Sequence, residues 1–506
     1  MRFLSLIGAV LCIVIAAGFS VQDWGWLISL MMVPAAVLLA RHAFRRGKLP
    51  PDVVLALGGV RWKEEDFCRG WEIDGRTGSG KTASAVVPII HQLKQNRPEV
   101  GILALDTKGD LSEPLARMAE DLDCQDDLVQ LEVKPDHATP DWKPKFTMNF
   151  LTDRSIPFST YARIIVDVAT AAGQKGGQAF FKVAAQTAIQ NTLSALAALD
   201  RPVTLPACAG ILASEANYKE MSEALAQLAK TRMELDPLVR YFHEFIKQPP
   251  EQLGGVRATV YNYLQPFTAP AIAEVFSPEY PTFSLSQIDQ GKLISVKIPQ
   301  KYQVEKKYVG LLLKVLFYIH ALRRYDLTQD ERRQKNLIVM VLDEAQETVL
   351  LSEDGTSDYN TVDKIRGARA TTINSTQSPT SYIPPMGNRE KTEVFLLNLG
   401  NKIYFTAADK LASEMIADAI GKHTVKKRTY GRSAGKSTMS CREEDEHWIK
   451  PHELRDLPKH TAIIKHCEQR FRRLHLPPSR FTAQSKNVRG KIVVRSKIGC
   501  LPRGIA

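Results

Sequence analysis

The sequence predicts an α/β fold in which a parallel sheet is interrupted by an all-α region. Three observations predict it. The glycine-rich segment Gly75–Thr82 has the spacing of a phosphate-binding loop. The apolar run Leu337–Leu342 ends in two acids, as expected for a buried parallel strand whose carboxyl end reaches a ligand site. Between these two, residues 151–255 carry apolar side chains at helical spacing.

The glycine-rich segment predicts an ATP site. Its glycines let backbone N–H groups turn toward phosphate oxygens, Lys81 supplies a positive charge for the β and γ phosphates, and Thr82 supplies a hydroxyl ligand for Mg²⁺. Lys81 is therefore expected to act in catalysis as well as in binding. The residues expected to bind the nucleotide are Gly75, Arg76, Thr77, Gly78, Ser79, Gly80, Lys81 and Thr82.

The acidic strand is the expected partner of this loop. Asp343 would hold Mg²⁺ together with Thr82, and Glu344 would polarise the water that attacks the γ-phosphate. The alternative is a core strand followed by a solvated acidic turn. The presence of the phosphate-binding loop favours the catalytic interpretation.

The segments on either side of the loop differ in character. Phe67–Asp74, which precedes it, contains charged residues and a glycine and lacks the pattern of a buried strand. After the loop, Ala83–Asn96 predicts a crossover helix with a kink at Pro88, and Val100–Leu105 predicts a strand. That strand ends in the polar run 106–110, near the expected nucleotide edge. The alternative interpretation is that this run is a simple turn after a strand. Loop, helix and strand make one βαβ unit.

Residues 151–255 predict an all-α insertion. Its expected helices cover 161–171, 179–199, 216–228 and 235–247. Apolar helix faces of this kind usually form a core, so no single residue here is assigned to a partner.

Strand patterns return after the insertion. Strands are expected at 292–298, 370–375 and 401–406, with a helix at 308–325. The second of these strands runs into Gln377, which would sense the γ-phosphate if it lies beside the acidic strand. A polar turn after a strand is an equally good interpretation.

The first 48 residues predict a membrane anchor of two helices, at about 3–20 and 24–40. Arg2 precedes the first apolar segment and a basic cluster at 41–48 follows the second, so both ends are expected in the cytoplasm. The alternative for the first segment is a cleavable signal peptide. Seven scattered cysteines without paired metal spacing fit a reducing compartment.

The order of these parts resembles a family, the TraG/TraD-type coupling ATPases of conjugative type IV secretion. The shared features are the two amino-terminal spans, the phosphate-binding loop, a helical insertion before the acidic strand, and the acidic strand itself. The matching stretches also include Val86–Ile89, Asp106–Gly109, Arg366–Gln377 and Ile449–Pro451 with Leu454.

The resemblance, rather than the spacing, implies a RecA-like motor that forms a homo-hexamer at the bacterial inner membrane and uses ATP and Mg²⁺. It implies a trans-acting arginine just ahead of the strand that ends in Gln377. Arg366 occupies that place, and Arg369 is the second choice. Without the resemblance, both would be taken for exposed helix residues. The expected divisions are an anchor at 1–48, a nucleotide-binding domain at 49–150 and 256–480 around the insertion, and a basic tail at 481–506.

Most of the excess charge lies near the carboxyl end. The formal net charge is +12, and residues 465–503 contain eleven Lys or Arg against one acid. Such a segment suits nucleic-acid phosphates or the anionic inner leaflet. Phe471 and Phe481 alternate with arginines, as in a surface that stacks on single strands. A solvated or disordered end is the alternative.

The function expected from these features is a coupling ATPase. It would recruit DNA, single-stranded and carried with a relaxase, and pass it to the components of a type IV secretion channel. One alternative is a DNA translocase of chromosome segregation. Another is a docking receptor for protein effectors that uses nucleotide as an assembly switch. A small-solute pump is disfavoured, because two short spans cannot build a pathway.

Overall fold

The computed structural model describes residues 49–174, 178–352, 355–433 and 436–482. The two apolar segments predicted to cross a membrane, at about 3–20 and 24–40, lie outside these ranges, and so do residues 483–506 of the basic tail. Within the described ranges, no helix is both long and apolar enough to cross a membrane.

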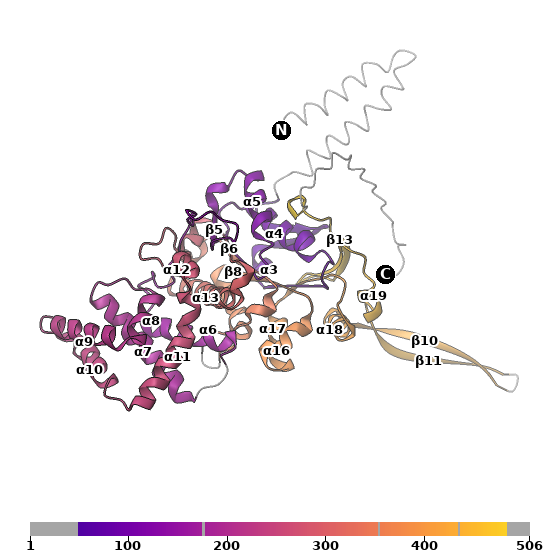
Figure 1. Cartoon of the computed structure of the whole chain (residues 1–506). Helices are drawn as coiled ribbons and strands as arrows, with labels where there is room; N and C mark the ends of the chain where they lie inside the picture. The colour runs from indigo at the N-terminus through magenta and orange to yellow at the C-terminus, as the bar shows by residue number, and fades with distance from the viewer. Residues whose placement is uncertain (1–48, 175–177, 353–354, 434–435, 483–506) are drawn as a thin grey trace, which may run out of the picture.

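A nine-stranded sheet forms the centre of the molecule (Figure 1). Seven neighbouring strands are parallel, and two antiparallel strands extend one edge. Because the parallel strands share one direction, their carboxyl ends meet at a single edge. In spatial order the strands are β13 (Arg472–His475), β12 (Thr461–Lys465), β9 (Asn401–Tyr404), β3 (Trp71–Asp74), β8 (Ala370–Thr376), β7 (Ile338–Asp343), β4 (Gly101–Asp106), β6 (Leu293–Lys297) and β5 (Leu128–Glu132).

The apolar residues of the central strands alternate between two cores. Val339 and Val341 of β7 face the first core, which is covered by the βαβ crossover. Met340 and Leu342 face the second core, covered by α13 (Gln303–Leu322). Burial on both faces explains why β4 and β7 are continuous apolar runs in the sequence. The elements that cover the first face are the hairpin β1 (Val53–Leu57) and β2 (Val60–Lys63), η1 (Thr82–Val86), α4 (Val87–Asn96) and α5 (Ser112–Asp121).

The crossover helix begins in an unusual way. Its first turn, η1, is π-helical, and α4 continues it with Pro88 in its own first turn. Proline is tolerated in the first turn of an α-helix, because the N–H that it lacks would have no helical partner there. The proline therefore coincides with a change of helix type.

The strand before the phosphate-binding loop is buried, although the sequence pattern did not predict a buried strand there. β3 is central, between β8 and β9, and all four of its residues are buried despite two acids. Glu72 forms an ion pair with Lys402 of β9 and accepts a hydrogen bond from the Tyr404 hydroxyl at 3.3 Å. Burial, and then the charge of Glu72, raise the pKa of Asp74 well above its ordinary value. A carboxyl paired with a lysine, Glu72, and a buried carboxyl with a raised pKa, Asp74, stand where the pattern requires apolar residues.

The helical region continues past the boundary expected at residue 255, which lies inside α11. Its core is continuous with the second face of the sheet through α13. In Figure 1 the region lies on the left of the sheet. Its helices are α6 (Phe158–Ala172), α7 (Ala179–Ala198), α8 (Leu205–Ala213), α9 (Glu215–Ala229), α10 (Asp236–Phe245), α11 (Pro250–Thr268) and α12 (Pro270–Phe276).

A long hairpin leaves the opposite side of the molecule. β10 (Lys422–Ser433) and β11 (Lys436–His447) pair antiparallel over 12 residues each and project from α18 (Lys410–Ile420) and α19 (Pro451–Arg455) (Figure 1). We call residues 422–447 the arm. Sequence analysis did not find it, because its strands are polar and charged on both faces and lack the alternation of a half-buried strand.

Part of the basic carboxyl-terminal segment belongs to the body of the protein. Phe481 is buried in the first core and packs its ring 5.2 Å from that of His91, and Arg480 forms an ion pair with Asp121. Phe471 is half-buried against the small core next to α18 and α19. Phe481 is thus unavailable to stack on a nucleic-acid base, contrary to that interpretation of the sequence.

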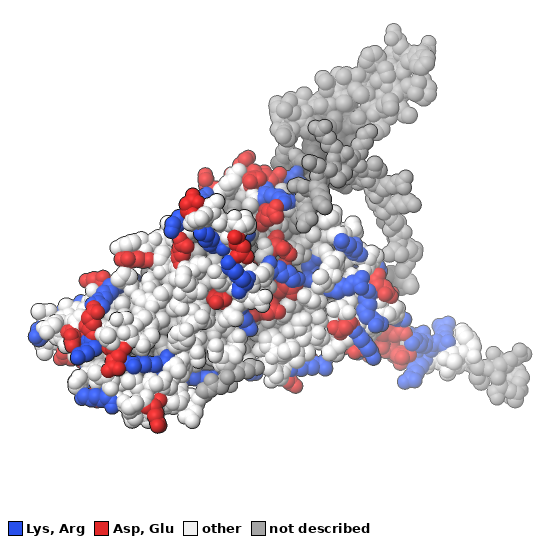
Figure 2. Space-filling view, viewed as in Figure 1, with Lys and Arg blue, Asp and Glu red and all other residues white. Residues whose placement is uncertain are grey.

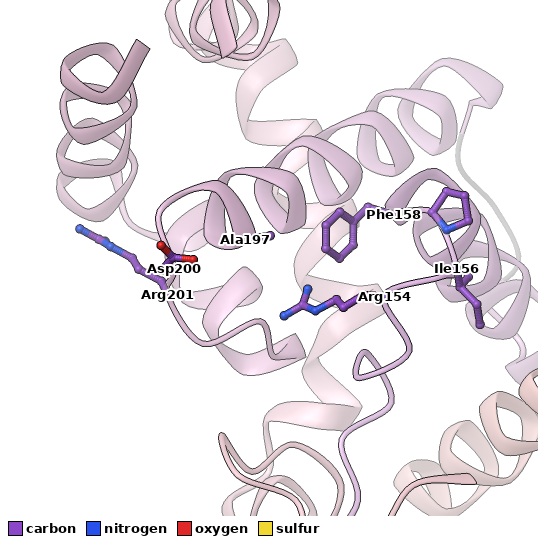
Figure 3. Close-up of a pocket in the computed structure, with 7 residues that line it drawn as sticks. Arg154, Ile156, Phe158, Ala197, Asp200 and Arg201 are labelled. Atoms are coloured by element: carbon purple, nitrogen blue, oxygen red, sulfur yellow. The ribbon is translucent and has the colours of Figure 1, made fainter. Parts of the chain in front are cut away.

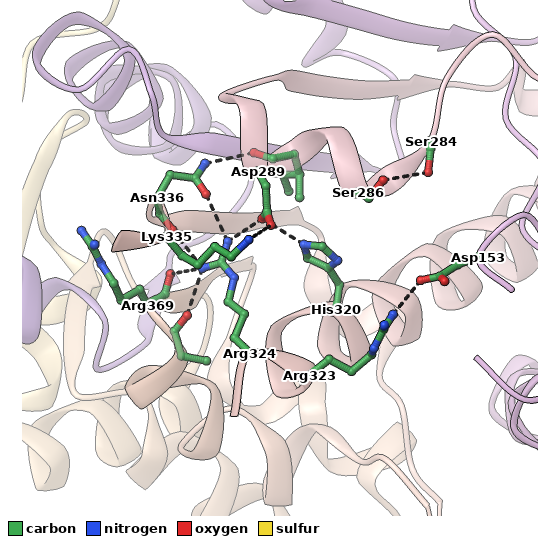
Figure 4. A network of polar contacts seen from close by, with 12 residues as sticks. Asp153, Ser284, Ser286, Asp289, His320, Arg323, Arg324, Lys335, Asn336 and Arg369 are labelled. Carbon is green, nitrogen blue, oxygen red and sulfur yellow. Dashed lines mark hydrogen bonds and ion pairs between the residues drawn. The ribbon is translucent and has the colours of Figure 1, made fainter. Parts of the chain in front are cut away.

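A buried polar network ties the amino ends of the strands together (Figure 4). Asp289 accepts hydrogen bonds from His320 at 2.9 Å and from Arg324 at 2.6 Å. Arg324 also donates to the carbonyl oxygens of Asn336, just before β7, and of Ala368, just before β8. One guanidinium therefore joins the end of α13 to the start of two central strands.

Candidate nucleotide site

The phosphate-binding loop lies at the carboxyl edge of the sheet, directly after β3. The Arg76 N–H donates to the Thr406 carbonyl at 2.8 Å, and the Ser79 N–H donates to the Arg76 carbonyl at 3.1 Å. Gly78 has φ +80 and Gly80 has φ +106, a backbone conformation that favours glycine. Arg76, Thr77 and Gly78 are exposed at the rim of the loop.

His460 supports the loop from the carboxyl-terminal segment, and sequence analysis missed it. Its N–H donates to the Ser79 carbonyl at 3.0 Å, and its Nδ1 lies 2.8 Å from the Ser84 hydroxyl. A Cβ at Gly80 would lie 2.5 Å from the same Nδ1. The imidazole therefore packs directly on the loop and leaves room only for glycine at position 80.

Lys81 and Thr82 connect the loop to the acidic strand. The Lys81 ammonium donates to the Gly75 carbonyl, and burial lowers its pKa while the charges of Glu344 and Asp343 act in the opposite direction. The Thr82 hydroxyl donates to Asp343 Oδ2 at 3.0 Å. The two residues expected to ligate Mg²⁺ thus already lie side by side.

Asp343 is almost fully buried at the end of β7. Burial, and then the charge of Asp106 on the neighbouring strand β4, raise its pKa. Asp106 is itself held by the N–H groups of Lys108 at 2.7 Å and Leu111 at 2.8 Å. A divalent cation at this edge would be attracted by both carboxyls.

Glu344 has a left-handed backbone, with φ 55 and ψ 52. For a residue with a side chain this conformation is costly, and it turns the carboxyl back toward the edge of the sheet. The carboxylate accepts hydrogen bonds from Gln346 at 2.8 Å and Gln377 at 3.3 Å, and it forms an ion pair with Lys108. Burial raises the pKa of Glu344, but the hydrogen bonds from Gln346 and Lys108 and the charges of Lys108 and Lys81 outweigh burial and lower it.

Lys108 is the second site residue that sequence analysis missed. It lies in the polar run after β4, and its carbonyl and that of Thr107 accept from Gln300 and Lys306, which precede or begin α13. The signal in the sequence was the position of this run at the same edge as the acidic strand. The stretch 106–109 was among those that resemble the family, but Lys108 was given no role there, so only the contact with Glu344 identifies it as a site residue.

The predicted sensor and arginine residues fall in two different places. Gln377 follows β8 at the carboxyl edge, beside Glu344. Arg366 lies in η8 (Lys364–Ala368), at the other end of β8, and its exposed side chain forms no hydrogen bond or ion pair within the described residues. Arg369 is engaged in its own chain, with Nε 2.6 Å from Glu64 Oε1 and Nη2 2.9 Å from Glu64 Oε2.

One further hollow of the structure adjoins the nucleotide edge. It is lined by Glu344, Lys108, Lys306 and Gln377 among others. Another lies in the helical region, where Arg154 extends over the Phe158 ring, near Arg201 (Figure 3). No residue predicted for the site lines this second hollow.

Comparison with known proteins assigns the chain to a family. The family model described as "Type IV secretory system Conjugative DNA transfer" matches residues 46–470. The chain belongs to this conjugative DNA transfer family. The matched region contains the phosphate-binding loop, the acidic strand, the helical region and the arm. A comparison with curated proteins finds no match.

Solved structures share the fold of this member of the conjugative DNA transfer family. The unbound bacterial conjugative coupling protein TrwBdeltaN70 is 12% identical with a TM-score of 0.59, covering 86% of this chain and 90% of that one. The plasmid coupling protein TrwB in complex with the ATP analogue ADPNP is 12% identical with a TM-score of 0.61, covering 88% and 94%. TrwB in complex with ADP and Mg²⁺ is 12% identical with a TM-score of 0.59, covering 85% and 90%. The likeness extends over both the sheet and the helical region.

Proposed function

We propose that this protein is the coupling ATPase of a conjugative type IV secretion system. The observation that carries the proposal is the convergence of Lys81, Thr82, Asp343 and Glu344 at one edge of the sheet, in a chain that belongs to the conjugative DNA transfer family. The family supplies the cargo class, DNA, and the site supplies the chemistry that could drive its movement.

ATP and Mg²⁺ are the proposed cofactors. TrwB, which shares the fold, has been crystallised with an ATP analogue and with ADP and Mg²⁺. The residues here fit the same groups: the loop turns at two glycines with positive φ, the Ser79 hydroxyl is buried without a partner in the described structure, and Thr82 already contacts Asp343. When bound, Mg²⁺ would neutralise charge on the phosphates.

The side chains around the site have distinct proposed roles. Lys81 holds the β and γ phosphates, and Thr82 and Asp343 hold the metal. Glu344, which is paired with Lys108, orients and polarises the attacking water. Gln377 donates a hydrogen bond to the same carboxylate. Through this contact, a change at Glu344 caused by the γ-phosphate would be transmitted to β8.

The proposed assembly is a homo-hexamer anchored in the bacterial inner membrane by residues 1–48. Arg366 lies too far along β8 to reach its own site, but it is exposed and has no ion pair with any residue that the structure describes, as expected of an arginine that acts on a neighbouring subunit. Arg369 is a poor candidate for that role, since Glu64 holds its guanidinium. A relaxase with single-stranded DNA, and the channel components, are the proposed partners.

ATP hydrolysis by the full-length protein in lipid nanodiscs tests the proposal. The rate is measured at one low salt concentration, with and without single- or double-stranded DNA, beside the Glu344→Gln variant. DNA-stimulated hydrolysis that is lost in the variant is the expected result. Nucleotide binding with hydrolysis indifferent to DNA would contradict it and favour a docking receptor.

A further inference from the structure

A pocket between α17 (Arg389–Asn398) and α18 lies apart from the nucleotide site. Its volume is about 360 Å³, within the range of roughly 300–1,000 Å³ that small-molecule sites occupy. The two helices cover the second face of the sheet near β9 and β12, and the pocket is the space between them. No residue of the phosphate-binding loop or of β7 lines it.

The floor of the pocket is formed by polar side chains of three neighbouring strands. Successive residues of a strand point to opposite faces of a sheet. Ile73 of β3 and Ile403 of β9 belong to the first core, so the polar residues next to them in sequence point to the second face. The floor residues are Glu72 of β3, Lys402 and Tyr404 of β9, and Lys465 of β12.

The walls of the pocket are apolar and come from the two helices. Leu396 and Leu397 of α17 line one side, and Met415 and Ile416 of α18 line the other. Leu397 is 79% exposed, so a large apolar side chain stands at the mouth with nothing covering it in the described structure. An apolar wall with an uncovered rim is typical of a ligand site.

The charged side chains at the mouth are paired within the chain. Arg389 pairs with Glu393 at 2.7 Å, and Asp418 lies 3.3 Å from Lys422 and accepts from His447 at 2.8 Å. Figure 2 shows acidic and basic side chains intermixed over the part of the surface where Figure 1 draws α17 and α18. Any preference of the pocket for one sign of charge therefore comes from its floor.

The floor carries one cation without an acid. Glu72 is taken up by Lys402 and by the Tyr404 hydroxyl, and Lys402 also donates to the Leu396 carbonyl at 2.8 Å. The half-buried Lys465 donates to the Ala419 carbonyl and forms no ion pair within the described residues. Because an ammonium has three N–H donors, Lys465 keeps donors free for a ligand. Burial, and then the charge of Lys402, lower the pKa of Lys465, and the charge of Glu72 acts in the opposite direction.

We propose that this pocket binds a small amphipathic carboxylate, whose head accepts hydrogen bonds from the Lys465 ammonium while its apolar body lies between α17 and α18. Charge complementarity selects the head, because the described chain supplies no acid to Lys465. The apolar walls select the body and disfavour a nucleotide or another ligand with several charges. The site lies outside the nucleotide edge, so the inference goes beyond the proposed function and does not rest on it.

Three probes that share one alkyl chain test the proposal. Octanoate is the carboxylate, octanamide is neutral and octylamine is a cation. Their affinities are measured by NMR titration of the full-length protein in nanodiscs of neutral lipid, with empty nanodiscs as the blank. A non-hydrolysable ATP analogue with Mg²⁺ is present in excess, so that no carboxylate binds at the phosphate-binding loop.

Removing the free cation should remove the preference for the carboxylate. The parent protein should bind octanoate at least about tenfold more tightly than octanamide, as expected for a hydrogen bond to a charged group, and octylamine least tightly. Lys465→Met should make octanoate and octanamide equal. Lys410→Met, which removes an exposed cation of α18 that does not line the pocket, should keep the preference. No octanoate binding, equal affinities in the parent, or an unchanged preference in Lys465→Met would overturn the proposal.

A second variant tests the mouth of the pocket without changing a buried residue. Leu397→Glu places an acid at the exposed rim and should weaken octanoate by about tenfold through repulsion and lost apolar contact. Met233→Glu is the matched control, because Met233 is an exposed apolar residue, 77% accessible, in the helical region. Equal octanoate affinity in these two variants would place the ligand elsewhere and overturn the proposal, even if Lys465→Met does not fold.

Discussion

Lys108 and Glu344 form an ion pair across the carboxyl edge of the sheet, although 236 positions separate them in the chain. The contact joins the turn after β4 to the residue that follows the carboxyl end of β7. Because Gln300 and Lys306 hold the same turn, it also links the site to the start of α13, whose opposite end contacts the strand starts around Asp289. The ion pair therefore lies between the nucleotide edge and the helix that supports the whole second face.

Removing the Lys108 charge should slow hydrolysis and shift its pH dependence. Lys108 lowers the pKa of Glu344, so Lys108→Met should raise that pKa and move the acidic limb of the kcat/KM profile to higher pH. We expect a loss of about tenfold on the acidic limb, the scale of one pKa unit, and little change at neutral pH, where the carboxylate is ionised in both proteins. Lys307→Met, in the same hollow but without contact to Glu344, is the control. An unshifted acidic limb would show that Lys108 does not tune this carboxylate.

Glu344→Gln should keep nucleotide binding and lower turnover by about a hundredfold or more, because an amide cannot accept the proton of the attacking water. Glu347→Gln is the matched control, as this exposed carboxyl lines the same hollow. Binding is followed with a fluorescent ATP analogue, and turnover by phosphate release. Comparable turnover in the two variants would remove Glu344 from the catalytic role.

Mixing inactive subunits tests whether Arg366 acts on a neighbour. Arg366→Ala and Lys81→Ala should each abolish turnover alone. In a mixed ring, a subunit with intact Lys81 can sit beside one with intact Arg366, so mixing should restore part of the activity. Mixtures that remain inactive, while both variants still assemble, would argue against a trans-acting Arg366.

Breaking the buried ion pair between Lys314 and Asp358 should lower the free energy of unfolding. Its ammonium and carboxylate lie 2.7 Å apart, with both side chains 1% exposed, and the Tyr318 hydroxyl donates to the same carboxylate at 2.8 Å. Asp358→Ala should destabilise the protein by about 3–5 kcal/mol, because it leaves a buried charge unpaired. Adding Lys314→Met should recover much of the lost thermal stability. A single variant as stable as the parent would contradict this reading of the pair.

The lowered pKa of Asp289 predicts that the folded protein loses stability in acid. Burial tends to raise its pKa, but the hydrogen bond from His320 and the charge of Arg324 outweigh burial and lower it. A carboxyl with a lowered folded pKa stabilises the fold above its ordinary pKa of about 4, and this contribution disappears as pH falls toward the folded value. Asp289→Asn should therefore lower Tm at neutral pH and show a smaller further drop between pH 5 and pH 3. Parallel pH curves for the two proteins would exclude Asp289 as a source of the acid sensitivity.

The sequence by itself determined the parts whose pattern is local. The phosphate-binding loop depends on spacing within eight positions, and the strands β4 and β7 are apolar runs because both of their faces are covered. The amphipathic helices α6, α7, α9 and α10 were found for the same reason. In each case the physical requirement acts on neighbouring residues, so it can be read along the chain.

Tertiary structure decided everything that depends on contacts between distant residues. β3 is buried with two acids because Lys402 pairs with one, and Arg369 pairs with Glu64 of its own chain, which makes it the poorer candidate for the proposed trans-acting arginine. Lys108 and His460 carry no motif and become site residues only where the folded chain places them. The interaction energy between two charges depends on the distance between them and on their burial. Neither quantity can be obtained from the order of the residues in the chain.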